Sequence, residues 1–179
     1  MDRKKISKHS KINPSAWVKK WAHLINRKGK ILDLACGNGR HLRYLLGRDQ
    51  IIVGIDIDLS ALVSLRNETN IELHCLDLEK KDTSLPDLEY AGIIVTNYLH
   101  RPLLNALPDY LSNQGVLIYE TFAIGNEMYG RPSNPDFLLR KNELNEQYSD
   151  SLDIIAFEEK FIDTPNPAVI QRICAVKSD

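Results

Sequence analysis

A glycine-rich turn between two apolar stretches is the part of this sequence best suited to bind a nucleotide-like ligand. The segment reads Ile31-Leu-Asp-Leu-Ala-Cys-Gly-Asn-Gly-Arg-His41. Gly37 and Gly39 permit a tight turn and a close approach of the backbone to a ligand. A helix that begins directly after the turn would add amide donors. The segment therefore predicts a strand, a binding turn and a helix, in that order.

Three kinds of nucleotide-binding turn compete for this segment. The phosphate-binding pattern G-x-x-x-x-G-K-S/T is absent. A dinucleotide fingerprint, G-x-G-x-x-G, requires a small residue at position 42, where this chain has Leu42. A bulky side chain there would hold the helix away from the strand and disfavour a pyrophosphate. Asp33, on the strand itself, favours a ligand with a cationic group, and capping of the glycine turn is its alternative role.

The elements that must position this turn alternate along the chain after Gly29. Apolar runs predict strands at residues 30–35, 51–55, 71–76, 91–96 and 115–119. Helical patterns lie between them, at residues 39–46, after Asp58 or Ser60 with Leu62, Val63 and Leu65 facing inward, and from Pro102 to Leu111. Strands separated by helices indicate a parallel, doubly wound sheet.

The two ends of the chain follow other patterns. Asn13 and Pro14 predict the N-cap and first residue of a helix. The apolar stripe of this helix is Trp17, Trp21, Leu24 and Ile25. Residues 153–162 and 168–176 read as strands separated by five residues, too few for a crossover helix, so they must be antiparallel. We therefore expect an α/β fold with a seven-stranded sheet, mostly parallel, ending in an antiparallel hairpin.

The glycine-rich segment resembles the first motif of class I S-adenosylmethionine-dependent methyltransferases, and the resemblance extends over about residues 13–176. Within that superfamily the chain is similar to small bacterial methyltransferases related to the tellurite-resistance methyltransferase. The resemblance implies a Rossmann-like fold and S-adenosyl-L-methionine as cofactor. It places five residues of the turn at the cofactor: Asp33, Ala35, Cys36, Gly37 and Gly39.

Three further segments match the family in order. Asp56–Ile57, 19 residues after Gly37, matches the acid that holds both ribose hydroxyls, since one carboxylate can accept two hydrogen bonds from a vicinal diol. Asp77–Leu78 matches the acid and the apolar residue at the adenine, and Asn97 matches the segment beside the methionine moiety. The alternatives are that Asp56 caps the next helix and that Asp77 is a surface carboxylate.

The residues after the fourth strand bear on the methyl acceptor. Family members that methylate planar amines often carry a Pro-Pro-aromatic run there, whereas this chain reads Asn97-Tyr-Leu-His-Arg101. This departure argues against an adenine or glutamine nitrogen and leaves oxygen, sulfur, carbon and other nitrogen acceptors open. His100 is the candidate general base because an imidazole can take up a proton near neutral pH. A locally hydrogen-bonded histidine at a helix start is the alternative.

The segment from Glu120 to Pro135 is too long for a plain connector and contains Gly125, Gly130, Tyr129 and Arg131. It leaves the carboxyl end of a strand, where open α/β sheets bind ligands. We expect it to form part of the acceptor site, with Tyr129 and Arg131 facing the transferable methyl group. A static surface loop is the alternative.

Charge is divided unevenly along the 179 residues. The net charge is −1, yet residues 1–30 contain ten basic residues and one acidic residue. Residues 1–12 are therefore expected to form a flexible basic arm, ahead of a single domain at residues 13–179. Such an arm favours a weak contact with an anionic partner such as RNA, and docking on the acidic body of the protein is the alternative.

Composition narrows the class of protein. With 43% hydrophobic and 26% charged residues, the chain is typical of a globular protein, and no apolar run is long enough to span a membrane. Three cysteines match no metal-ligand spacing and fit reduced thiols in the cytoplasm. No metal is expected, and the oligomeric state is left open.

The sequence thus predicts a cytoplasmic S-adenosylmethionine-dependent methyltransferase whose acceptor is unidentified. A small molecule is favoured, and RNA or protein acceptors remain alternatives. Two other classes stay open: a catalytically silent cofactor-binding module that supports a partner enzyme, and a nicotinamide-dependent Rossmann protein.

Overall fold

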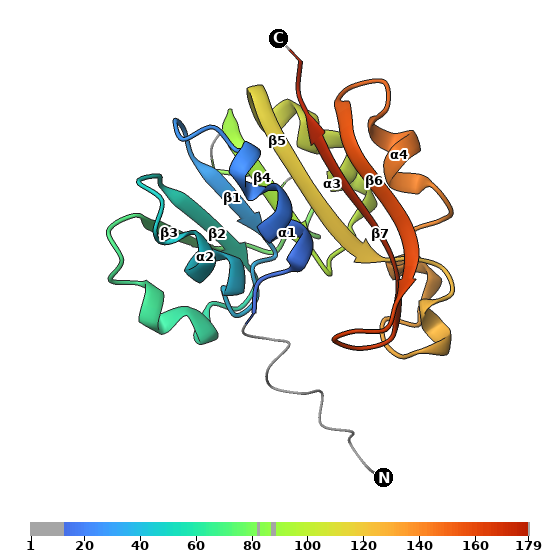
Figure 1. Ribbon diagram of the computed structural model, residues 1–179. Coiled ribbons are helices and arrows are strands. Elements are labelled where there is room, and N and C mark those ends of the chain that lie inside the picture. Colours follow the sequence, from blue (N-terminus) through green and yellow to red (C-terminus); the bar gives the residue numbers. More distant parts are fainter. Residues whose placement is uncertain (1–12, 82, 87–88, 179) are drawn as a thin grey trace.

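The computed structural model describes residues 13–81, 83–86 and 89–178, and over these residues it shows one seven-stranded sheet flanked by short helices (Figure 1). The strands lie in the order β3-β2-β1-β4-β5-β7-β6. Their bounds are β1 (Ile31–Leu34), β2 (Ile52–Asp56), β3 (Ile71–Cys75), β4 (Tyr90–Thr96), β5 (Leu111–Phe122), β6 (Asp153–Ile162) and β7 (Ala168–Val176).

Strands β1 to β5 run parallel to one another, and β7 is antiparallel to both β5 and β6. The predicted fold class, including the C-terminal antiparallel hairpin, is confirmed. The strand order changes direction between β1 and β4, and open α/β sheets bind ligands beyond the carboxyl ends of the strands at such a point. The carboxyl ends of β1, β2 and β4 are therefore the first place to look for a site.

Helices cover both faces of the sheet. On one face lie α1 (Ala16–Trp21), α2 (Arg40–Leu45) and the 3₁₀ segments η1 (Ala22–Leu24) and η2 (Ser60–Leu65). The other face is covered by α3 (Arg101–Ala106), η3 (Leu107–Tyr110) and α4 (Glu143–Tyr148). Two short 3₁₀ turns, η4 (Asn126–Met128) and η5 (Pro135–Phe137), follow β5. Each face buries its own apolar cluster, as expected of a doubly wound sheet.

The first helix begins later than the sequence predicts. Its N-cap is Ser15, not Asn13, because the Ser15 Oγ accepts hydrogen bonds from the backbone N–H groups of Trp17 at 3.0 Å and Val18 at 3.4 Å. Trp17 is buried as predicted, whereas Trp21 is half-buried and Leu24 is exposed. The helix is held mainly through its first turn.

Two further local predictions were wrong. Val63 is 61% exposed, because the segment is a 3₁₀ helix in which residues three apart share a side, and Leu62 and Leu65 occupy the inward one. Leu111 begins β5 instead of ending a helix, since α3 gives way to a 3₁₀ turn that contains Pro108. No helix joins β3 to β4 in the described part of residues 76–89.

The described residues contain no helix that is both long and apolar enough to span a bilayer.

Candidate functional site

The glycine-rich turn after β1 is built on left-handed backbone. Ala35, Gly37 and Gly39 have φ angles of +52°, +56° and +72°. A Cβ atom added to Gly39 would lie 2.6 Å from the end of the Leu62 side chain, and the left-handed backbone at this position favours glycine in addition. A Cβ added to Gly37 would meet nothing within 4 Å, so its backbone faces open space. Gly39 thus packs the turn against the protein, and Gly37 leaves it accessible to a ligand.

Leu42, which argued against a dinucleotide fingerprint, packs over the neighbouring strand. It is fully buried, and a Cβ added to Gly54 of β2 would lie 2.8 Å from its Cδ1 atom. The small residue that allows α2 to approach the sheet therefore lies on β2, not on α2 itself. This packing differs from that of a dinucleotide-binding helix, whose own third glycine provides the close approach.

Asp33 is a buried carboxylate with one unpartnered oxygen. Its Oδ1 lies 3.4 Å from Nδ1 of His41, whose Nε2 accepts a hydrogen bond from the Ser15 N–H at 3.2 Å. The proton of a neutral His41 is therefore on Nδ1 and faces Asp33. The Asp33 Oδ2 is buried and has no hydrogen-bond partner among the described residues. A carboxylate that is 1% exposed and half satisfied suits a cationic ligand group.

Asp56, at the end of β2, lies directly across from the glycine-rich turn. Its Oδ2 accepts a hydrogen bond from the Gly37 N–H at 2.7 Å, and its Oδ1 accepts one from the Asp58 N–H at 3.1 Å. The side chain is half-buried, and Ile57 beside it is exposed. Each oxygen keeps a lone pair, so the carboxylate can still accept hydrogen bonds from two neighbouring hydroxyls.

Asp77 and Leu78 follow β3 and are both half-buried. The Asp77 Oδ1 accepts a hydrogen bond from the Glu79 N–H at 3.1 Å, and its carbonyl oxygen accepts one from the Thr83 hydroxyl at 2.9 Å. The carbonyl oxygen of Asp56 accepts a hydrogen bond from the Leu76 N–H at 3.0 Å. The ends of β2 and β3 are thereby held together at one edge of the sheet.

Tyr98 is a site residue that the sequence analysis did not select. Its hydroxyl is buried and has no hydrogen-bond partner among the described residues. Burial, followed by the nearby carboxylates of Glu79, Asp77 and Asp56, raises the pKa of Tyr98 to about 12. The hydroxyl therefore stays protonated and can donate to a ligand in the space bounded by these acids. An aromatic residue one position after Asn97 was the signal available in the sequence.

Asn97 turns the chain sharply after β4. Its φ angle is +56°, a conformation that asparagine adopts more readily than most residues. The Asn97 N–H donates to the Glu120 carbonyl at 2.9 Å, and the Tyr119 hydroxyl donates to the Tyr98 carbonyl at 2.8 Å. These bonds fix the backbone of the turn while the Asn97 side chain remains exposed.

A row of polar side chains crosses the carboxyl end of the sheet on the α1 face. Thr96, Glu120, Arg172 and Glu158 are paired across β4, β5, β7 and β6. Arg172 bridges Glu120 at 3.1 Å and Glu158 at 2.6 Å. The Ser15 hydroxyl donates to the Glu120 Oε1 at 2.7 Å. The N-cap of α1 is thereby tied both to β5 and, through His41, to the glycine-rich turn.

Arg40 connects this row to the turn. Its Nη2 donates to the Thr96 hydroxyl at 3.1 Å. Burial lowers the pKa of Arg40, and the carboxylates of Glu120 and Asp33 oppose that effect. The guanidinium is thus a partly buried positive charge between the ends of β1 and β4.

The Cys36 thiol in the turn is buried, and burial, followed by the charges of Asp33 and Asp56, raises its pKa. It is therefore a thiol, not a reactive thiolate, at neutral pH. In the part of the chain that the structure describes, no three His, Cys, Asp or Glu side chains are grouped closely enough to hold a metal ion.

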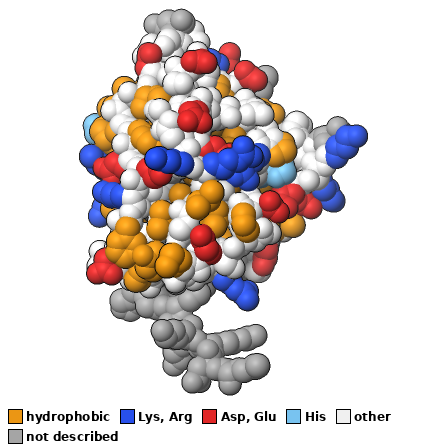
Figure 2. All heavy atoms as spheres, turned by 90° about the vertical axis from the view of Figure 1, so that its right-hand side faces the viewer, with side chains coloured by type: hydrophobic (Ala, Val, Ile, Leu, Met, Phe, Trp, Pro, Cys, Tyr) orange, Lys and Arg blue, Asp and Glu red, His pale blue; other side chains and the backbone are white. Residues whose placement is uncertain are grey.

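The three predicted catalytic residues belong to two segments, His100 to the start of α3 and both Tyr129 and Arg131 to the segment after β5. His100 occupies the N-cap position of α3, is half-buried and makes no capping hydrogen bond with its side chain. Tyr129 packs on Phe161 of β6, with ring centroids 4.9 Å apart, and Arg131 is exposed. Figure 2 shows hydrophobic side chains gathered low on this side of the molecule, over the segment after β5 and the β6–β7 hairpin.

A pocket of about 190 Å³ lies between the turn after β4 and the segment after β5. Its polar lining comes from Glu79, Asn97, Tyr98 and Thr121. Through Tyr98 it lies close to the carboxylates of Asp56 and Asp77, which raise the pKa of that residue. His100, Tyr129 and Arg131 are not among its lining residues.

Comparison with known proteins agrees with this geometry. Residues 31–113, from β1 to the start of β5, match a family described as a methyltransferase domain. The matched residues make up less than half of the 179-residue chain. A malonyl-(acyl-carrier protein) O-methyltransferase from Acetivibrio thermocellus is 31% identical over 103 residues. That alignment covers 51% of this chain and 35% of the relative, so the chain matches about a third of the relative's length.

Solved structures share the methyltransferase fold over nearly the whole chain. TehB from Haemophilus influenzae superposes with a TM-score of 0.74 at 21% identity, covering 92% of this chain and 63% of TehB. A protein described as a SAM-dependent methyltransferase from Methanosarcina mazei has a TM-score of 0.67 at 15% identity, covering 93% of this chain and 99% of its own. At these identities the likeness is one of fold alone.

Removing the Tyr98 hydroxyl tests its place in the candidate site. We expect Tyr98→Phe to weaken S-adenosylhomocysteine binding by about three- to tenfold, the effect of losing one neutral hydrogen bond. Titration calorimetry measures the change. Tyr110→Phe, on η3, is the matched control and should bind like the unchanged protein. Equal affinity in Tyr98→Phe would show that the Tyr98 hydroxyl does not contact the ligand.

Proposed function

We propose that the protein transfers the methyl group of S-adenosyl-L-methionine to a small-molecule acceptor. The observation that supports this most strongly is the set of unsatisfied polar atoms around the glycine-rich turn. A buried carboxylate oxygen of Asp33, the free lone pairs of Asp56 and the unpartnered hydroxyl of Tyr98 lie at the ends of β1, β2 and β4. The two carboxylates offer hydrogen-bond acceptors for an ammonium group and a diol, and the hydroxyl offers a hydrogen-bond donor for a purine base.

The residues fit this cofactor group by group. Asp33 would hold the ammonium, Asp56 the ribose diol, and Asp77–Leu78 with Tyr98 the adenine. The open backbone at Gly37 would lie against the ligand. When bound, S-adenosylmethionine supplies a methyl group on a sulfonium, which is already a strong electrophile.

The contribution of the chain is then chiefly to bind and orient. Fixing the acceptor in line with the methyl group contributes up to about 7–11 kcal/mol of the barrier reduction. The hydrogen bonds at the Asn97 turn hold the backbone on one side of the pocket in place, which supports such an orientation. Only an acceptor that carries a proton needs a base, and His100, next to the pocket-lining Leu99, is the residue we propose for it.

Two alternatives are less well supported. The dinucleotide fingerprint of a nicotinamide-dependent Rossmann protein has a small residue where this chain has Leu42, whose side chain packs over Gly54 of β2. A catalytically silent binding module would share the cofactor site but would not need the pocket beside it. Titration calorimetry with S-adenosylhomocysteine and with NADH distinguishes the nicotinamide-dependent protein from the methyltransferase. We expect saturable binding of S-adenosylhomocysteine and no binding of NADH. Binding of NADH but not of S-adenosylhomocysteine would overturn the proposal.

The basic arm at residues 1–12 lies outside the described residues. We propose that the protein works in the cytoplasm and that this arm makes a weak contact with an anionic partner such as RNA, supported by its charge alone. Deleting residues 1–12 should then flatten the salt dependence of RNA binding, because each neutralised phosphate releases counterions. An unchanged salt dependence in a filter-binding assay would contradict the contact.

A further inference from the structure

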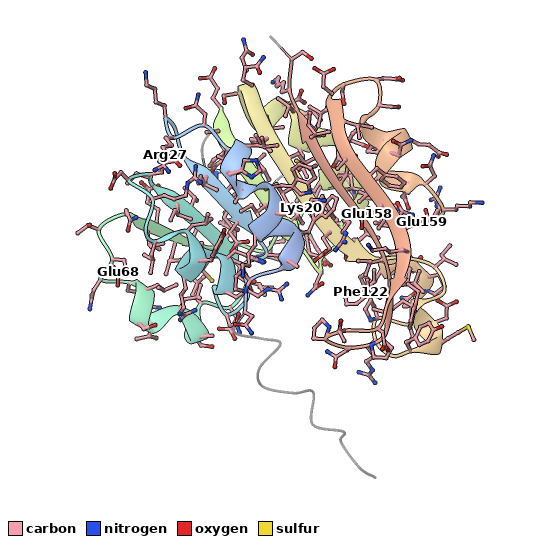
Figure 3. All side chains as sticks on the ribbon, viewed as in Figure 1. Lys20, Arg27, Glu68, Phe122, Glu158 and Glu159 are labelled. Carbon is pink, nitrogen blue, oxygen red and sulfur yellow. The ribbon has the colours of Figure 1, made fainter. Side chains whose placement is uncertain are left out.

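The pocket between β4 and the segment after β5 has an apolar wall opposite its polar residues. This wall consists of Leu99, Phe122, Pro132 and Phe137. Phe122 is the last residue of β5 and lies at the lower end of the sheet (Figure 3). Leu99 is buried in the core of the α3 face, whereas Phe137 is 46% exposed. Two phenyl rings thus lie at the surface of a small cavity without being needed for the core.

The segment that carries this wall is held in place at several points. Ala123 and Leu139 form a bridge, and the Ile124 N–H donates to the Leu139 carbonyl at 2.9 Å. The buried Asn126 donates to the Pro132 carbonyl at 3.0 Å and accepts from the Val169 N–H at 3.3 Å. These contacts make the segment a shaped wall, not a solvated loop.

Arg101 fixes the part of the wall around Phe137. Its guanidinium donates to the carbonyls of Asp136 at 2.8 Å and Leu138 at 2.9 Å. It also pairs with Glu143 of α4 at 2.8 Å. The positive charge of Arg101 is therefore used within the protein and does not serve a ligand.

The charges around the pocket select against an anion. Among the residues that the structure describes, Glu79 is the charged one in its lining, and no lysine or arginine lines it. An acceptor that bears a carboxylate or phosphate would lose the hydration of its charge next to the Glu79 carboxylate. It would gain no cationic side chain in return. Asn97 and Thr121 offer neutral hydrogen-bonding groups to a hydroxyl or an amine.

We propose that this pocket binds the acceptor of the methyl transfer and that the acceptor is a small ring-bearing molecule without negative charge. Its ring would contact Phe122 and Phe137, and its hydroxyl or amino group would lie at Asn97. A volume of about 190 Å³ holds about six water molecules at about 30 Å³ each, which is the size of a single substituted ring. The inference that this ligand is the methyl acceptor rests on the proposed function. The inference about its charge and shape rests on the pocket alone.

Three matched fluorinated probes test the pocket. Fluorine NMR would follow the binding of 4-fluorophenol, 4-fluorobenzylamine and 4-fluorobenzoate, which are neutral, cationic and anionic, with and without S-adenosylhomocysteine. We expect saturable, millimolar binding of the first two and at least about tenfold weaker binding of the benzoate. Phe137→Ala should weaken 4-fluorophenol at least about fivefold. Phe161→Ala, which removes an equally exposed ring outside the pocket, should change it less than twofold.

The outcomes separate this inference from the proposed function. Preferred binding of the benzoate, or equal binding of 4-fluorophenol by the Phe137→Ala variant, would overturn the inference. Binding of S-adenosylhomocysteine with no saturable binding of any probe would overturn it while leaving the proposed function intact. The expected probe pattern without any binding of S-adenosylhomocysteine would support the pocket and overturn the methyltransferase proposal.

Discussion

Replacing Asp56 by alanine is expected to weaken S-adenosylhomocysteine binding by about 30- to 150-fold, equal to about 2–3 kcal/mol. In the function we propose, this carboxylate accepts hydrogen bonds from the ribose hydroxyls, and hydrogen bonds to a charged group are the strong ones. It also holds the Gly37 N–H at 2.7 Å, so its loss releases the turn against which the ligand lies. Both effects act in the same direction, and titration calorimetry measures their sum.

Asp58→Ala is the matched control for this change. Asp58 is an exposed aspartate two residues after the end of β2, and its Oδ1 accepts a hydrogen bond from the Ser60 N–H at 2.8 Å. It has no place in the proposed ribose contact, so its removal should change affinity less than threefold. An unchanged affinity for S-adenosylhomocysteine in a folded Asp56→Ala variant would contradict the assignment of the ribose site.

Replacing Trp17 by alanine is expected to lower the free energy of unfolding by about 3–5 kcal/mol. The side chain is 1% exposed, and its Nε1 donates to the Ile173 carbonyl at 3.0 Å. The Arg172 guanidinium lies 4.4 Å above its ring, so the change also removes a cation–π contact. Urea unfolding, followed by far-ultraviolet circular dichroism, measures the loss.

Trp21 offers a comparison within the same helix. It is half-buried, and its Nε1 has no hydrogen-bond partner among the described residues. Trp21→Ala should therefore cost less than half as much as Trp17→Ala. If the two variants lose equal stability, or Trp17→Ala loses less than about 1 kcal/mol, then α1 is not anchored through Trp17 as described.

The sequence predicted the sheet well because its strands are short, buried apolar runs. Residues 71–76 and 153–162 were placed within one residue of β3 and β6. Five residues between the last two strands left antiparallel pairing as the one topology available. β5 is longer than predicted at both ends, because Leu111 pairs with Tyr90 of β4 and residues 120–122 pair with β7. Such pairing depends on distant residues and has no local signal.

The site was predictable where it follows local sequence and not where it depends on long-range contacts. The glycine-rich turn, Asp33, Asp56 and Asp77 each end or follow a recognisable strand. By contrast, Ser15 reaches Glu120 across 105 residues of sequence, and neither residue carries a motif. Tyr98 is marked as a site residue by the absence of a partner for its hydroxyl, which a sequence cannot show.

The segment after β5 illustrates the same limit. Its length and its aromatic residues predicted a role at the acceptor, and we still propose one. The structure brings Phe122, Pro132 and Phe137 of this region to the pocket, while Tyr129 packs on Phe161 across the hairpin. Which aromatic faces inward is decided by the bonds of Asn126 and Arg101, from elements far apart in the chain.

Transfer of a radiolabelled methyl group from S-adenosylmethionine into a fractionated cell extract tests the central claim most directly. We expect label in the small-molecule fraction with the unchanged protein, and at least about tenfold less with Asp56→Ala at a cofactor concentration below saturation. Label in the RNA or protein fraction would contradict a small acceptor. A folded protein that binds S-adenosylhomocysteine and labels no fraction would contradict methyl transfer itself.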